Sequence, residues 1–140
     1  LGQWWWHYSP RTGDVAQSFP VYSVHQHAMG PMALMAVAAA GGTDHREAVS
    51  LSHRWIQHNE LGVDLLDLRA GTLWRDIEPR ESELEKLATH SRSLLGLGEP
   101  DLDKRRARLT FNRETRPYEW AWCLYAGAIA GGQTRERHVV

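Results

Sequence analysis

Two helix-forming segments separated by only a few residues constrain the fold more than any other feature of the sequence. The stretch from about Ser23 to Ala40 carries methionine and leucine among many alanines, and Gly41-Gly42 ends it. A second helix is expected to begin at Asp44, which has the capping-box spacing to Glu47, and to end near Asn59. Because so short a connection makes two helices antiparallel neighbours, the sequence predicts an αα-hairpin.

Pro31 divides the first of these segments and leaves two histidines at its start. Proline has no backbone N–H, so the helix either kinks at Pro31 or begins near Gly30. Histidines 25 and 27 share a face if the backbone is extended, but they lie about 200° apart if it is helical. His25 is one helical turn from Met29, and we expect it to be the histidine that faces inward.

The segments outside the helical hairpin alternate between short apolar runs and polar stretches. Residues 2–14 form an extended aromatic segment and a turn, and Gly71 supplies the left-handed position of a later turn. The other expected elements are strands within 63–68 and 72–77, a helix from Glu81 to Leu95, a basic loop over 96–116, a helix from Pro117 to Ala130 that is apolar nearly all round, and a polar tail.

Glycine and tryptophan recur at the turns that bracket the helical hairpin. Gly2-Gln3-Trp4 precedes it, its second helix ends with Trp55-Ile56-Gln57, and Gly71-Thr72-Leu73-Trp74 follows. This order resembles the repeat of the α/α-toroids of terpenoid cyclases and protein prenyltransferases, and more loosely that of six-hairpin carbohydrate enzymes. The resemblance covers about residues 2–78, with 116–130 as a later helix. It implies an all-α fold of antiparallel helical hairpins with one short β-hairpin.

The length of the chain limits how much of such a toroid is present. The 140 residues are enough for one domain, whereas a closed toroid needs several more hairpins than this sequence provides. The resemblance therefore implies that residues 1–140 form a single helical-hairpin domain, the C-terminal part or a subunit of a larger α/α barrel. A possible oligomer follows from the same expectation.

Composition excludes several classes of function. Sixteen basic side chains against 17 acidic ones give no global charge for nucleic acid, and no apolar run is long enough to span a membrane. One cysteine, Cys123, rules out an internal disulfide framework, and the spacings of a structural zinc site are absent. We therefore expect a cytoplasmic protein that needs no cofactor and no metal.

Aromatic residues are the chain's departure from an average composition, and we expect some of them to bind a substrate. There are seven tryptophans, three of them consecutive at positions 4–6, and adjacent residues of an extended segment point to opposite faces. At most one or two of these three can therefore face a common site, and packing at helix ends is the alternative for the run as a whole. The candidate substrate-binding residues are Trp5, Tyr8, Tyr22, Trp74, Arg116 and Tyr118.

Two residues are candidates for acid–base catalysis. His25 is the first, and Glu119 is the second because it opens an apolar helix and can point into the same cavity. The alternatives are a structural or zinc-binding role for His25 with His27, and a helix-dipole role for Glu119. The basic stretch 104–116 is either a phosphate-binding segment or a solvated surface, and Cys123 is expected to be buried and inert.

Two functions follow from these observations. The first is an enzyme portion that binds an isoprenoid or a sugar-containing small molecule in an aromatic-lined cavity. The second is a non-catalytic helical module that completes a barrel by binding a partner chain, or the remainder of a longer chain.

Overall fold

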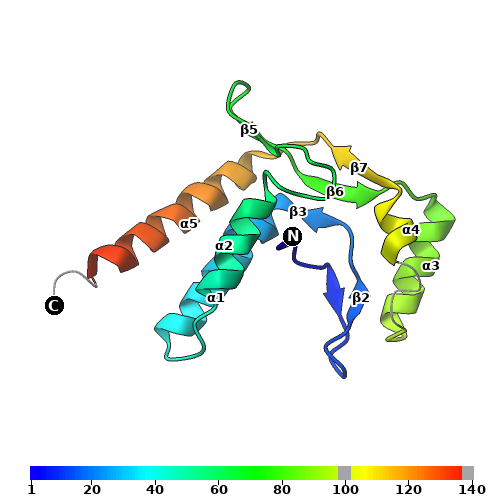
Figure 1. The fold of residues 1–140 in the computed structure, drawn as a ribbon, viewed down its shortest axis with the longest axis horizontal. Coiled ribbons are helices and arrows are strands. Elements are labelled where there is room, and N and C mark those ends of the chain that lie inside the picture. Colours follow the sequence, from blue (N-terminus) through cyan, green and yellow to red (C-terminus); the bar gives the residue numbers. More distant parts are fainter. Residues whose placement is uncertain (98–101, 137–140) are drawn as a thin grey trace.

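The fold combines short strands with helices (Figure 1). The computed structural model describes residues 1–97 and 102–136. The helical elements are the π-helix η1 (His25–Met29), α1 (Gly30–Ala39), α2 (Arg46–Trp55), α3 (Glu83–Leu94), α4 (Leu102–Arg106) and α5 (Pro117–Glu136). The strands are β1 (His7–Tyr8), β2 (Val15–Gln17), β3 (Val21–Tyr22), β4 (Leu66–Asp67), β5 (Thr72–Leu73), β6 (Asp76–Pro79) and β7 (Leu109–Asn112).

The prediction of an all-α fold is wrong. Within the described residues, the strands form three small antiparallel sheets: β1-β2, β3-β6-β7 and β4-β5. The three-stranded sheet pairs Val21 with Ile77, and Ile77 with Phe111. It joins segments that are far apart along the chain, so no local pattern could reveal it, and the fold is mixed α/β.

The stretch 96–116 is also not the loop that its basic composition predicts. It contains α4 and β7, and in β7 Leu109 and Phe111 alternate with Thr110 and Asn112, which is the period of a strand. The apolar pair packs against the core. Arginines of this stretch form ion pairs, for example Arg108 with Glu85 at 2.8 Å and Arg105 with Glu81 at 3.4 Å.

The helical hairpin is present, with a different start to its second helix. Helices α1 and α2 lie side by side, and α5 passes beside α1 before extending away from the sheet (Figure 1). The Asp44 carboxylate accepts a hydrogen bond from the Arg46 N–H at 3.0 Å, so α2 begins at Arg46 without the predicted capping box. A complete capping box forms instead between Ser82 and Glu85, where α3 begins.

The core lies between the three-stranded sheet and the second helix of the hairpin. Trp55, the last residue of α2, is fully buried against this sheet. Ile77 of β6 is fully buried on the sheet side. The remaining members of the core are Phe19, Val21, Ile56, Leu65 and Leu73. The predicted β4-β5 hairpin is confirmed, and Gly71 in its turn has a φ of 62°.

Apolar side chains remain exposed at both ends of the molecule. Leu84 and Leu87 of α3 are 80% and 63% exposed. Leu124 and Tyr125 of α5 are exposed as well. Of the helices in the described residues, none has the length and apolar character required to cross a membrane.

Candidate functional site

The π-helix η1 is the element that organises the candidate site. It leads directly into α1, whose second residue is Pro31. Because Pro31 lacks an N–H, the carbonyl of His27 four residues earlier has no helical donor from that position. Nε2 of His53, on α2, approaches this carbonyl at 3.1 Å, and against a carbonyl the ring nitrogen must be the donor. A side chain of the neighbouring helix thus satisfies the group that proline leaves open.

Gln26 attaches the N-terminal segment to this element. Its buried side chain accepts a hydrogen bond from the Trp4 N–H at 2.7 Å and donates to the carbonyls of Gly2 at 2.6 Å and Ser52 at 3.2 Å. The Trp4 ring then lies on Gly30, where a Cβ would be 1.5 Å from the ring. The packing of the first tryptophan therefore depends on glycine at this position.

The two histidines of η1 face different surroundings. His25 is exposed, and its ring lies 5.6 Å from Tyr22 and 5.8 Å from Trp6. His27 points to the other side, where its Nε2 contacts Sγ of Cys123 on α5. The inward-facing histidine is therefore His27, contrary to the expectation for His25.

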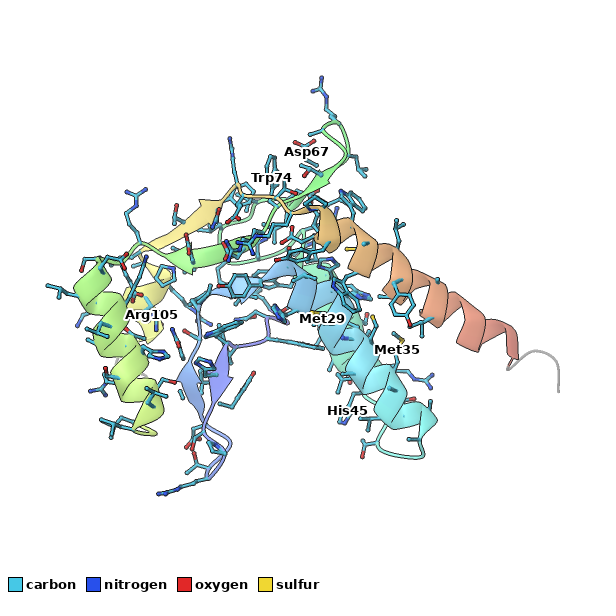
Figure 2. The ribbon with its side chains drawn as sticks, turned by 180° about the vertical axis from the view of Figure 1, so that it is seen from behind. Met29, Met35, His45, Asp67, Trp74 and Arg105 are labelled. Atoms are coloured by element: carbon cyan, nitrogen blue, oxygen red, sulfur yellow. The ribbon has the colours of Figure 1, made fainter. Side chains whose placement is uncertain are left out.

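His27 and Cys123 lie on the wall of a cavity of about 410 Å³, which we call the helical groove. It is open on one side and is lined by residues of η1, α1, α2, α5 and the β4-β5 hairpin; Met35, labelled in Figure 2, lies on its α1 side. Its lining is mostly apolar. The apolar residues include Pro31, Met35, Ile56, Leu73, Trp120 and Ala126, and the polar ones are His27, His53, Gln57 and Cys123.

Burial keeps the His27–Cys123 pair uncharged. Desolvation lowers the pKa of His27 to about 4, with a smaller contribution from the charge of His53. Desolvation likewise raises the pKa of Cys123 to about 11, and the charge of Glu119 adds to this. At neutral pH the thiol is therefore protonated and the imidazole is neutral, so the S–H can donate to Nε2.

Glu119 lies one helical turn before Cys123 on α5. It is 1% exposed, and neither carboxylate oxygen has a hydrogen-bond partner among the described residues. Burial raises its pKa, which the backbone N–H of Arg116 and the charges of Arg75 and Arg116 partly oppose. A buried carboxyl with a raised pKa beside a thiol–imidazole pair is a candidate functional group.

A second polar cluster, which we call the charged edge, lies beside His25 and consists of Tyr22, Arg75, Asp76 and Glu114. The Arg75 guanidinium donates to Glu114, lies 5.2 Å from the centre of the Tyr22 ring, and is 3.8 Å from the Asp76 carboxylate. Desolvation raises the pKa of Asp76 to about 7, and the charge of Glu78 contributes further. Unlike the groove, this cluster contains a compensating cation.

The structure places the eight residues predicted for the site in several groups, of which one joins His25 to Tyr22. No hydrogen bond or ring contact joins His25 to Glu119 among the described residues. Tyr22 lies on the charged edge, whereas Trp5 packs against Phe19 in the core, with ring centres 5.4 Å apart. The others make local contacts: Tyr8 with the Trp5 N–H, Trp74 with Phe111, and Arg116 with Tyr118 and Glu114.

Sequence reasoning missed His27, Cys123 and Asp76 as members of polar clusters. The one available signal was the four-residue spacing of Glu119 and Cys123, which puts both on one helix face. A search of the described residues finds no group of three potential ligands for a metal ion. Comparisons with protein-family models, curated proteins and solved structures give no match, so the chemistry of the site is the basis for a functional assignment.

Proposed function

We propose that this chain binds a small molecule with a hydrocarbon chain, of the isoprenoid class, in the helical groove. The observation that supports the proposal most directly is the cavity of about 410 Å³, whose apolar lining is interrupted by the His27–Cys123 pair. Its volume lies within the ~300–1,000 Å³ range of small-molecule sites. A few converging polar groups on an otherwise apolar wall are characteristic of such sites.

The lining favours a hydrocarbon over a sugar. A sugar ring presents hydroxyl groups all round, and each one that is buried needs a hydrogen-bond partner. The groove offers polar side chains only at His27, His53, Gln57 and Cys123, whereas Met35, Ile56 and other apolar groups form most of its surface. Burial of a hydrocarbon there is favourable by roughly 25 cal/mol per Å².

In this proposal His27 and Cys123 form the polar part of the groove wall. Glu119 lies behind this wall, one helical turn before Cys123, and keeps the acid–base role that its sequence position suggests. His27 replaces His25 as the histidine of the site, because His27 lines the groove and His25 is exposed on the other side of η1.

A bulky side chain at position 127 provides the test. Gly127 lines the groove on α5, and a Cβ there meets no heavy atom within 4 Å, so Gly127→Phe is designed to place a ring in the cavity from an unobstructed position. The matched control is Ala128→Phe, at the adjacent exposed position outside the lining. The ligands are farnesol and geraniol, with glucose and cellobiose as polar comparisons, and isothermal titration calorimetry is the measurement.

We expect farnesol to bind the unchanged protein and the Ala128→Phe variant with similar Kd. Gly127→Phe should raise that Kd by at least about tenfold, because the added ring occupies the volume that the chain would fill. Absence of farnesol binding, or equal affinity in the two variants, would contradict the proposal. Preferential binding of cellobiose would instead favour a sugar ligand.

A further inference from the structure

The thiol of Cys123 combines three properties that a structural cysteine does not need. It lines the helical groove, its sulfur contacts the imidazole Nε2 of His27, and it is the single cysteine of the chain. Contact between a nucleophile and a base is the arrangement on which covalent catalysis by cysteine depends. The pair comes from α5 and η1, which are 96 residues apart at these positions.

Glu119 is a buried acid beside this pair. Its carboxyl is buried one turn from Cys123, and neither oxygen has a partner among the described residues. It is also close enough for its charge to raise the pKa of the thiol. Burial favours the protonated form of Glu119, which keeps a second charge away from the thiol–imidazole pair.

We propose that Cys123 is an acyl acceptor, which takes a long-chain acyl group from an acyl thioester and holds the chain in the helical groove. The proposal rests on the proposed function in one respect, because the acyl chain needs the same hydrocarbon site. It adds a covalent step and an acyl donor, neither of which ligand binding requires.

The reaction needs only the thiol, the imidazole and the donor thioester. Sγ attacks the carbonyl carbon of the donor thioester while its proton moves to Nε2 of His27. The new S–C bond forms, the donor S–C bond breaks, and the imidazolium returns the proton to the departing thiolate. The products are an acyl thioester on Cys123 and the free donor thiol, with no change of oxidation state.

The electrostatics of the pair keep the thiol unreactive until a donor is in place. The thiol is protonated at neutral pH, so it has little reactivity toward electrophiles in bulk solution. The imidazole contacts Sγ but is a weak base because its pKa is lowered, so the proton can move to Nε2 only as the new S–C bond forms. Reaction is therefore expected only for a donor whose chain brings its carbonyl to the sulfur.

The first experiment uses the unchanged protein and two donors that differ only in their chain. Decanoyl-N-acetylcysteamine and acetyl-N-acetylcysteamine present the same thioester, and intact-protein mass spectrometry follows the adduct over time. We expect the decanoyl donor to react at least about tenfold faster, because its chain is buried in the groove. Equal rates for the two donors, or no adduct with either, would overturn the proposal.

Variants then assign the step to its residues. Cys123→Ala should give no adduct, and His27→Ala should slow acylation by about 100-fold, the usual scale of general-base catalysis. Free imidazole should restore part of the His27→Ala rate, which a purely structural role would not produce. Acylation of His27→Ala at the unchanged rate would overturn the assignment, and the two-donor comparison decides the proposal if this variant does not fold.

The outcomes separate this inference from the proposed function. Farnesol binding without any decanoyl adduct would leave the groove as a ligand site and reject the acyl-acceptor role. Failure of both experiments would reject both. A decanoyl adduct whose rate is unaffected by Gly127→Phe would place the chain outside the groove and reject the proposal as stated.

Discussion

The helical groove and the charged edge lie on different sides of η1, and each contains an acidic or basic group with a displaced pKa. At the charged edge, Asp76 is 1% exposed, but the Arg75 guanidinium lies 3.8 Å from its carboxylate. In the groove, His27 contacts the neutral thiol of Cys123, and no carboxylate is hydrogen-bonded to it among the described residues. The difference shows two ways of placing polar groups in an interior. At the charged edge a buried carboxyl lies beside a countercharge, whereas burial favours the uncharged forms of His27 and Cys123 in the groove.

This difference also explains why the groove is suited to an apolar ligand. A fixed charge on the groove wall would need water or a partner ion, and either would oppose the entry of a hydrocarbon. A neutral thiol–imidazole pair carries proton-transfer chemistry without that cost. The charged edge, with Arg75 and Glu114 partly accessible, suits a polar surface instead.

The largest expected effect is a pair of opposite pH dependences, one from each side. Asp76 has its folded-state pKa raised from 3.8 to about 7, so its contribution to stability is lost as the pH rises from about 4 to about 7. His27 has its folded-state pKa lowered from 6.5 to about 4, so its contribution is lost as the pH falls from about 6.5 to about 4. Each contribution is on the order of a few kcal/mol, and they oppose one another across this window.

Single variants should separate the two contributions. From pH 4 to pH 6.5 the free energy of unfolding of Asp76→Asn should change in the stabilising direction relative to the unchanged protein, because the loss caused by Asp76 is removed. Over the same interval that of His27→Ala should change in the destabilising direction, because the gain caused by His27 is removed. Urea unfolding at several pH values measures both, and parallel pH profiles for the two variants would show that the contrast between the two sides is absent.

A smaller effect is expected at Gly30, where η1 meets α1. Gly30→Ala places a Cβ 1.5 Å from the Trp4 ring, so the ring must move away from residue 30. We expect a loss of roughly 1–3 kcal/mol in the free energy of unfolding, the usual cost of overpacking. Thermal unfolding followed by circular dichroism is the measurement. A Tm equal to that of the unchanged protein would mean that Trp4 is not packed against Gly30.

The smallest effect concerns the groove alone. Gly127→Ala adds a methyl group that meets nothing within 4 Å and removes a glycine from the interior of α5. The variant should be more stable by up to about 1 kcal/mol, because alanine loses less backbone entropy in a helix. Its farnesol affinity should stay close to that of the unchanged protein, in contrast to Gly127→Phe. A loss of stability would show that the backbone at 127 is not helical.

Local signals predicted part of the fold correctly, and the reason is that they need no distant partner. Gly71 forms its turn with a positive φ, α1 begins at Gly30 beside Pro31, and α5 begins at Pro117. Each depends on the backbone preferences of the residue itself or of its neighbours. The capping box at Asp44 failed because the Asp44 side chain instead bonds the N–H and guanidinium of Arg46.

The candidate site was less predictable, because its members are chosen by distant contacts. Glu119 was identified from its place at the start of an apolar helix, and it is buried with uncommitted oxygens. His27 was ranked below His25 because an ordinary helical turn relates His25 to Met29. The π-helix and the position of α5 instead put His27 against Cys123.

Propensity, periodicity and backbone conformation over a few residues are enough to predict that the hairpin has two helices, that Gly71 forms a turn and that the final helix starts at Pro117. The β3-β6-β7 sheet and the groove that α5 forms beside η1 depend instead on tertiary contacts. Strand pairing and burial depend on which distant segments meet. Burial then sets the charge of groups such as His27 and Asp76, so their chemistry is a property of the folded chain.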